Sequence, residues 1–383
     1  MPIPRGDAVA LTKTLVAIDS QNPSLVPNGH GEHAVASALA EVLRDWGFSV
    51  DVHDVVPGRP NVVARIGRPG GRALMFNGHL DVVGIEGMTH EPFEPVEKDG
   101  LLYGRGAADM KSGVAAMCSA AVRAADRGIQ GEIVVAAVID EEFGSLGTKD
   151  IIARGIRADA AIVTEPTRLS IMPAHKGFVW VKATIHGRAA HGSRWELGVD
   201  AIRQAGLFLA EVEKYDSTTL AERSHPLLGR PSIHASFIQG GSGMSTYPDS
   251  CTVWLERRTI PCESTGDIMS EIEELCDRVR MEKADFKYDL EMSFAQQPSD
   301  VSRNSTIVRQ LQMSLANCGV REKMEGMSAW TDAALLNAAD IPAIHFGPGD
   351  IAVAHAAEEY VPVAEIESAT RVLMDLAGRW HSA

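Results

Sequence analysis

Short apolar runs alternate with longer amphipathic segments along the first part of this chain. The short runs are enriched in β-branched residues and have the length of strands buried on both faces, whereas the longer segments repeat their apolar positions with a helical period. The apolar runs lie at 48–55, 61–67, 72–78, 132–140 and 159–165. The helical segments lie near 7–19, 30–46 and 109–128. This alternation predicts an α/β fold, with a mostly parallel sheet flanked by helices.

The pattern changes near residue 176, where strands with two unlike faces begin. The segment 177–187 alternates polar and apolar residues, as a half-exposed strand does. Further strands are expected at 231–241, 250–260 and 286–295, with helices near 198–214 and 264–283. Beyond about residue 305 the helix–strand rhythm of the first part resumes. We therefore expect one domain built from 1–175 and 295–383, and an inserted α+β domain at 176–294.

Composition and charge narrow the class of protein. The chain has 383 residues, enough for two domains with sizeable cores, and its net charge of −15 argues against nucleic acid or an anionic membrane as a partner. Its five cysteines form no C-x-x-C pair, so neither a thiolate zinc site nor a disulfide framework is indicated. No signal peptide or membrane-spanning run is recognisable, and we expect a cytoplasmic protein.

Histidines and acids follow the predicted buried strands or precede a helix, in five separate segments. Each has an ordinary explanation when taken alone: a satisfied core or loop histidine, a helix N-cap, or a solvated acidic turn. Ligands of open α/β sheets collect beyond the carboxyl ends of the strands, however, and all five segments converge there. The residues are His79, Asp109, Glu141, Glu142, Glu165 and His355. Their convergence predicts one site.

Two histidines and several carboxylates form a donor set suited to Zn²⁺, Co²⁺ or Mn²⁺. Asp109 can bridge two metals, each of which then takes one histidine and one terminal carboxylate. Adjacent residues point in different directions, so one of Glu141 and Glu142 would ligate and the other would act as a general base. Asp81 can hydrogen-bond the ring nitrogen of His79 that holds no metal. A site with a single metal ion remains an alternative.

The chain resembles the metallopeptidase family that includes dizinc aminoacylase, acetylornithine deacetylase, succinyl-diaminopimelate desuccinylase and glutamate carboxypeptidase. The resemblance covers essentially the whole chain, and its motifs occur in the family's order. They are "GHLDVV", "YGRGAADMKSG", "DEEFGSLGT", "TEPT", "KGFVWVKATIHGRAAHGSRWELGVDAI", "ERRTIP", "WTDAALL" and "FGPG…H…E". The resemblance implies a zinc-peptidase-like catalytic domain with an inserted lid or dimerisation domain.

The family also implies a role for each residue of the site. One zinc would be held by His79, Asp109 and Glu165, and the other by Asp109, Glu142 and His355. Glu141 would be the general base, with Asp81 as the partner of His79, and the Asp109–Met110 peptide bond would be cis.

In the inserted domain the resemblance marks four further residues. His191 matches a histidine that reaches the active site of the partner subunit in a homodimer, although by itself it would be read as a surface loop residue. Arg258 matches an arginine that grips a substrate carboxylate, and strand alternation turns its neighbour Arg257 away, which we expect to be solvated. Ser245 stands where relatives often carry asparagine, and Gly241 permits close backbone approach to a ligand.

The predicted reaction is hydrolysis of the amide bond of a small N-acyl amino acid by a water molecule between the two metals, with Glu141 moving the proton and His191 polarising the carbonyl. Two alternatives stay open. The same constellation serves carboxypeptidases and dipeptidases, and a catalytically dead homologue could act as a binding protein. The presence of all candidate residues speaks against the dead homologue.

Overall fold

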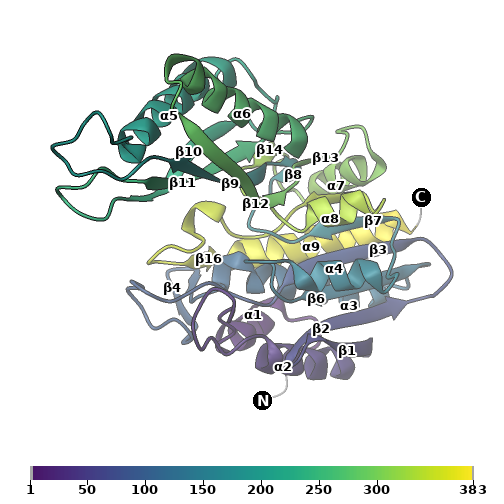
Figure 1. The fold of residues 1–383 in the computed structure, drawn as a ribbon. Helices are drawn as coiled ribbons and strands as arrows, with labels where there is room; N and C mark the ends of the chain where they lie inside the picture. The colour runs from purple at the N-terminus through teal and green to yellow at the C-terminus, as the bar shows by residue number, and fades with distance from the viewer. Residues whose placement is uncertain (1–2, 382–383) are drawn as a thin grey trace. The chain divides into compact units, whose positions relative to one another are not determined.

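A computed structural model describes residues 3–381 of the chain, and Figure 1 shows its elements. The helices are α1 Ala8–Val16, α2 His33–Asp45, η1 Ala107–Lys111, α3 Ser112–Asp126, α4 Leu146–Ala153, α5 Ala201–Tyr215, η2 Asp216–Leu220, α6 Thr265–Glu282, α7 Thr306–Asn317, α8 Ala333–Ala338, η3 Ile351–Val353 and α9 Val363–Trp380. The strands are β1 Ser49–Val56, β2 Arg59–Gly67, β3 Ala73–His79, β4 Val96–Lys98, β5 Leu101–Tyr103, β6 Glu132–Val138, β7 Ala160–Val163, β8 Ile171–His175, β9 Gly177–His186, β10 Ser232–Gly240, β11 Ser250–Thr259, β12 Lys287–Gln296, β13 Ser299–Asp300, β14 Met324–Met327, β15 Ala343–His345 and β16 Tyr360–Pro362.

The chain divides into two compact units. The first comprises the residues up to Pro173, Val301–Glu325 and those from Thr331 onward, and the second comprises Ala174–Asp300 and Gly326–Trp330. The sequence placed the insertion at 176–294, so the second unit extends further at both ends and gains a short return segment. This segment has no periodic pattern of its own, which is why the sequence did not reveal it.

The first unit is built on a mixed sheet with the strand order β1-β2-β6-β3-β7-β15-β8. Its four central strands, β6, β3, β7 and β15, pair in parallel. The pairs β1–β2, β2–β6 and β15–β8 are antiparallel. The predicted α/β fold with a helix-flanked sheet is confirmed, with parallel pairing confined to the centre of the sheet.

Both faces of this sheet are covered by helices, as its continuous apolar strands require. In β3, Leu74 and Phe76 pack into a core with the apolar faces of α1, α2, α3, α7 and α9, while Met75 points to the opposite face. There it meets Ile151 of α4 and Leu336 of α8. Because β3, β6, β7 and β15 run in parallel between these layers, their carboxyl ends open on one edge of the sheet.

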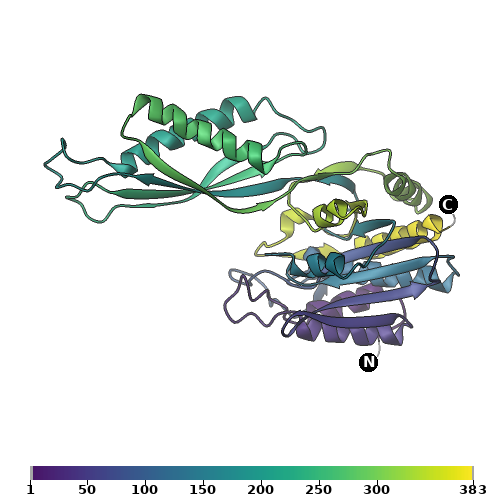
Figure 2. The ribbon, with the colours of Figure 1, turned by 45° about the vertical axis from the view of Figure 1, so that its right-hand side comes forward.

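The second unit has an antiparallel sheet with the order β10-β11-β9-β12. Figure 2 shows α5 and α6 lying together on one face of it. The inward residues of β9, among them Val179, Val181 and Ala183, form the core with Phe208 of α5 and Leu275 of α6. Alternate positions of β9 face away from these helices, which explains its two-sided sequence pattern.

Across residues 3–381, no helix combines the length and apolar character needed to cross a bilayer. The cytoplasmic location expected from the sequence stays a prediction.

Candidate metal centre and active site

The carboxyl edge of the parallel strands gathers the candidate metal ligands. His79 is the last residue of β3, and Glu165 follows β7 by two residues. Asp109 lies in η1, directly before α3. Helix α3 approaches the end of β7 so closely that a Cβ atom at Gly113 would lie 2.0 Å from the carbonyl oxygen of Thr164. This glycine therefore permits the approach that brings Asp109 beside Glu165.

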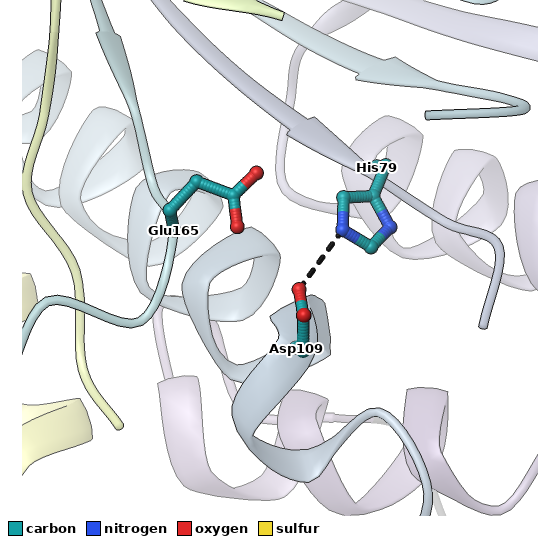
Figure 3. A group of neighbouring side chains, drawn as sticks. All are labelled: His79, Asp109 and Glu165. Carbon is teal, nitrogen blue, oxygen red and sulfur yellow. Dashed lines mark hydrogen bonds and ion pairs between the residues drawn. The ribbon is translucent and has the colours of Figure 1, made fainter. Parts of the chain in front are cut away.

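His79, Asp109 and Glu165 form the first group, and Figure 3 shows their polar atoms pointing toward one another. One ligand atom from each lies within 4.8 Å of the other two, and all three residues are buried. His79 Nε2 is 3.0 Å from Asp109 Oδ1. Glu165 Oε1 is buried without a hydrogen-bond partner among the described residues. A buried carboxylate oxygen without a hydrogen-bond partner is costly, and a bound cation would compensate it.

Asp109, Glu142 and His355 form the second group, with ligand atoms again within 4.8 Å of one another. His355 Nε2 lies 3.1 Å from the carboxylate of Glu142 and 3.5 Å from Asp109 Oδ2. Asp109 thus turns one oxygen toward His79 and the other toward His355. That is the arrangement of a carboxylate shared by two cations.

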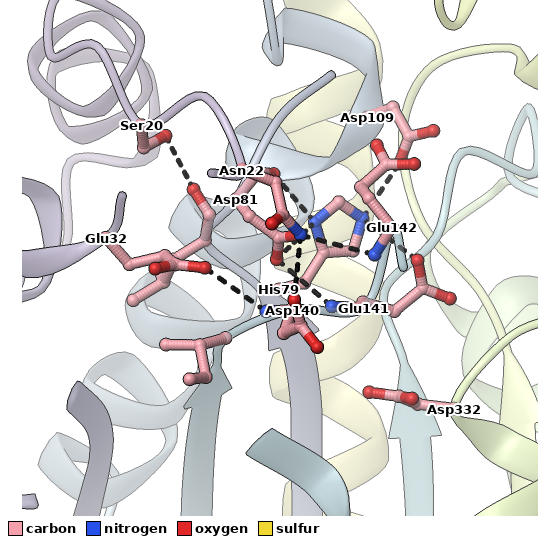
Figure 4. A network of polar contacts seen from close by, with 12 residues as sticks. Ser20, Asn22, Glu32, His79, Asp81, Asp109, Asp140, Glu141, Glu142 and Asp332 are labelled. Carbon is pink, nitrogen blue, oxygen red and sulfur yellow. Dashed lines mark hydrogen bonds and ion pairs between the residues drawn. The ribbon is translucent and has the colours of Figure 1, made fainter. Parts of the chain in front are cut away.

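Glu141 belongs to neither group, although its side chain is nearly buried at the same place. Its Oε2 atom lies 4.0 Å from His79 Nε2. The chain turns sharply just before it, because Asp140 has a left-handed backbone with φ 65°. The turn separates the side chains of Glu141 and Glu142, and Figure 4 shows them leaving it in different directions.

Asp81 contacts His79 differently from the prediction. The ring nitrogen Nδ1 of His79 lies 2.9 Å from the backbone carbonyl oxygen of Asp81, whereas the carboxylate is 3.7 Å away. The Nδ1–H group therefore donates to the carbonyl and leaves Nε2 for a cation. The carboxylate instead accepts the backbone N–H groups of Glu141 and Glu142, each at 3.2 Å. The peptide bond between Asp109 and Met110 is cis, as expected.

The electrostatics of the site show a shortage of positive charge. Burial raises the pKa of Glu141 and of Glu165 well above the ordinary value, and neighbouring carboxylates add to both shifts. Burial lowers the pKa of His355, but Asp109 and Glu142 outweigh it and raise this pKa to about 10. Burial also lowers the pKa of His79, but the hydrogen bond and the charge of Asp109 outweigh it and raise this pKa well above its usual range. These shifts all favour protonation, which is the response of a buried acidic site that lacks a cation.

The donor chemistry fits a pair of divalent transition-metal ions. Each group offers one imidazole and two carboxylates, one of them shared, which leaves open positions on tetrahedral or five-coordinate ions. Sulfur donors are absent from both groups, and this favours zinc, cobalt or manganese over softer metals.

Several buried polar residues around the site were missed by the sequence interpretation. Glu359 accepts the backbone N–H groups of Ala108 and Asp109 and pairs with Arg105 at 2.7 Å. Asp332 accepts a hydrogen bond from Thr148 at 2.6 Å and adds to the raised pKa of Glu141. The "WTDAALL" and "FGPG…H…E" motifs contain Asp332 and Glu359, so the signal was present without a role attached. A third set is Asn22, Glu32, Arg59 and Asp140. Asp140 opens the "DEEFGSLGT" motif, again without a role attached, and the other three gave no such signal.

In the second unit, His191 and Ser245 lie side by side. His191 forms an isolated bridge with Thr246, and the N–H of Gly192 donates to the carbonyl of Ser245 at 2.7 Å. His191 is exposed, and its Nδ1 atom is 2.8 Å from the hydroxyl of Ser193. Gly241 has a left-handed backbone with φ 85°, which a glycine adopts without strain.

Arg258 is placed at the other end of the same sheet, half-exposed and paired with Glu256. Its guanidinium lies 5.2 Å from the ring centre of Phe178. The expectation for Arg257 was wrong: its side chain is fully buried and pairs with Glu263 at 2.5 Å. The two arginines do point to opposite faces, but the face of Arg257 is the core.

Comparison with known proteins agrees with the motifs. The model of peptidase family M20/M25/M40 matches residues 75–379. An N-formyl-4-amino-5-aminomethyl-2-methylpyrimidine deformylase of Bacillus subtilis is 28% identical over 415 residues, covering 98% of this chain and 95% of that protein. An acetylornithine deacetylase of Myxococcus xanthus is 31% identical over 340 residues, covering 86% of this chain and 88% of its own.

Among solved structures, a Bacillus subtilis protein described as a dinuclear metal binding peptidase has the same fold. It superposes with a TM-score of 0.76 at 15% identity, covering 98% of each chain. These matches confirm the family to which the sequence motifs pointed.

Proposed function

Because this chain belongs to peptidase family M20/M25/M40 and is therefore a metallo-hydrolase of amide or peptide bonds, we propose that it removes the acyl group from a small N-acyl amine, such as an N-acyl amino acid, with two metal ions bound. The observation that carries the proposal is the shared Asp109, whose two oxygens face His79 and His355.

The residues that would hold the metals follow from the two groups. His79, Asp109 and Glu165 would bind one ion, and Asp109, Glu142 and His355 the other. Zinc fits the donor set, with cobalt or manganese as substitutes. When bound, the ions would polarise the scissile carbonyl and make water a stronger nucleophile near neutral pH.

Glu141 supplies the proton transfer in this proposal. It accepts a proton from the attacking water as the carbon–oxygen bond forms, and it returns that proton to the amine nitrogen as the carbon–nitrogen bond breaks. The products are a carboxylate and an amine, so no further reactant is needed. Its exclusion from both ligand groups supports this role for Glu141 and the ligand role for Glu142. Asp81 would orient His79 and the turn that carries both glutamates.

The acyl-amine class of substrate is supported by the names of the relatives, a deformylase and a deacetylase. Arg258 would bind a carboxylate of the substrate, for which its planar fork is suited. Ser245 and Gly241 lie at the His191 end of the sheet, and in a homodimer they would line the acyl side of the substrate together with His191 of the same chain. The alternative within the family is a peptidase, because the same hydrolysis releases a terminal residue when the acyl group is an amino acid. The deformylase match favours the acyl-amine reading.

The proposed function is tested by loading the protein with zinc or cobalt and measuring amine release. The panel holds acetylornithine, succinyl-diaminopimelate, an N-formyl aminomethylpyrimidine, other N-acyl amino acids, dipeptides and tripeptides, with Glu141→Gln protein as the blank. Faster release from an acyl amine than from any peptide is the expected result. Faster peptide cleavage would assign the chain to the peptidases.

We further propose a homodimer in which His191 acts on the partner's substrate. Along β11 the ladder advances by eight residues from Ser250, opposite His186, to Arg258, opposite Phe178. At a strand rise of about 3.4 Å per residue, Ser250 and Arg258 of one chain lie about 27 Å apart. His191, which bridges Thr246, belongs to the loop at the Ser250 end. A dipeptide-sized substrate spans about 7 Å. We therefore infer that His191 and Arg258 of one chain serve different substrate molecules, as they would in a two-fold pair of chains.

Mixing inactive variants tests this arrangement. His191→Ala and Glu141→Ala proteins, exchanged into heterodimers, should regain part of the wild-type turnover, since one site then combines an intact Glu141 with an intact His191. Subunit exchange is followed with two affinity tags. Exchange without regained activity, or a fully active monomer, would overturn the shared site.

A further inference from the structure

The turn that carries Glu141 and Glu142 is held from behind by buried carboxylates. The backbone N–H of Asp140 donates to Glu32 Oε1 at 3.2 Å. The next two N–H groups, of Glu141 and Glu142, donate to the two oxygens of Asp81. Three consecutive backbone N–H groups thus donate to the carboxylates of Glu32 and Asp81, and this fixes the direction in which each glutamate leaves the turn.

Arg59, the first residue of β2, balances the charge of these acids. Its Nε and Nη2 atoms make a two-pronged contact with Glu32 at 2.7 and 2.6 Å. Nη2 also lies 3.0 Å from Asp140 Oδ1. The side chains are 10% exposed for Arg59, 0% for Glu32 and 1% for Asp140. A buried fork of this kind is both strong and specific in direction, because each N–H has a fixed target.

Asn22 joins this pair to Asp81. Its amide nitrogen donates to Asp81 Oδ2 at 2.8 Å and to Asp140 Oδ1 at 3.1 Å, as Figure 4 shows. Its amide oxygen accepts from Arg59 Nη2 at 3.2 Å. The backbone of Asn22 is itself fixed, because its N–H donates to the carbonyl of Val82, just beyond β3. The turn is thus tied to the start of β2 through Arg59 and to the segment beyond β3 through Asn22.

We propose that Arg59 and Asn22 are positioning residues for Glu141 and Glu142. They hold the turn so that Glu141 faces the reacting water while Glu142 faces the second metal. This inference rests on the proposed function for the roles of the two glutamates. Without Arg59 and Asn22, the acids Glu32, Asp81 and Asp140 would repel one another at the back of the turn, and their hold on its amides would loosen.

A displaced turn should affect turnover and one metal site, but not substrate binding. Asn22→Ala should lower kcat by roughly ten- to hundredfold, the effect of a misplacement near 1 Å or of a lost outer-shell partner. KM should stay within about threefold, because Asn22 lies behind the turn. In a calorimetric zinc titration, one of the two binding steps should lose about tenfold in affinity and the other should not.

Arg59 is tested with variants that guard against unfolding. Arg59→Met alone leaves the buried acids Glu32 and Asp140 without their cation. The double variant Arg59→Met/Glu32→Met removes the ion pair together, which a fold tolerates better. Arg59→Lys keeps the charge without the fork and should restore only part of kcat. Arg65→Met is the matched control: Arg65 lies on the same strand and pairs at 2.6 Å with Glu132, at the start of β6 rather than beyond its end.

The outcomes separate the two ideas. Wild-type kcat and wild-type zinc binding in the folded double variant and in Asn22→Ala would overturn the positioning role. An equal fall of kcat in Arg65→Met would show a general loss of stability and overturn it as well. If wild-type protein hydrolyses nothing on the panel, the proposed function fails, and the zinc titration alone then decides whether Arg59 and Asn22 position the Glu142 site.

Discussion

Replacing Glu141 by glutamine is the sharpest test of the site. The substitution keeps the size of the side chain and removes its ability to accept a proton. In the structure, Glu141 Oε2 stands 4.0 Å from His79 Nε2, close to the reacting groups, but neither ligand group uses it. We therefore expect full metal content and a large loss of turnover.

The size of the loss follows from the role. General acid–base assistance is worth roughly 10²–10⁴-fold, which is about 2.7–5.4 kcal/mol of activation free energy at 1.36 kcal/mol per factor of ten. The measurement is kcat on the best substrate, with zinc per chain determined on the same sample. Glu142→Gln is the control, because it changes the adjacent residue in the same way and should lower the zinc content.

Two results would refute this reasoning. A Glu141→Gln protein with turnover within about tenfold of wild type cannot have lost its general base. A Glu141→Gln protein that loses one zinc while Glu142→Gln keeps both would exchange the two assignments, and the geometry of the turn would then be wrong for the metal-bound protein.

Three other predictions concern stability and specificity. In metal-free protein the pKa of His355 is raised from 6.5 to about 10, so its stabilising contribution is complete below pH 6.5 and is lost as the pH rises toward 10. The unfolding temperature should therefore fall between these two pH values. His355→Gln or added zinc should make this fall smaller. Arg257→Met should lower the free energy of unfolding in urea by roughly 1.5–3 kcal/mol, because Glu263 loses one of its two arginine partners and keeps Arg223 at 2.9 Å, whereas Arg258→Met should leave stability unchanged and raise KM for carboxylate substrates. Zinc removal by a chelator should lower the unfolding temperature more at pH 8 than at pH 5, where protons compete for the same carboxylates and imidazoles.

The candidate ligands could be found from the sequence because each lies next to an element with a clear pattern. His79 and Glu165 come after buried apolar runs, and Asp109 precedes a helix with a small-residue face. In a parallel sheet such positions must meet at one edge, so chain order alone gives spatial proximity. The prediction reached these residues through topology, without knowledge of any distance.

The supporting residues follow no such rule. Arg59 opens a strand and Glu32 precedes a helix, and nothing in the periodicity of either element indicates that the two pair beneath the turn at Asp140. Glu32 and Arg59 come together only through the packing of α2 and β2 in the folded chain. Arg257 is a different case. Val253, Leu255 and Arg257 occupy every second position of β11 and share one face, so the apolar character of that face did mark Arg257 as buried.

The three acids at Asp140, Glu141 and Glu142 can be understood as three consecutive side chains whose charges are compensated to different degrees. Asp140 turns back to Arg59, within the fold, which supplies its counter-charge at 3.0 Å. Glu142 turns to His355 and shares its charge with Asp109. Glu141 contacts no cationic side chain closely and keeps the least compensated charge. A carboxylate in that condition holds a proton readily, and the same lack of a partner that raises its pKa in the metal-free protein leaves it available to exchange protons with a substrate.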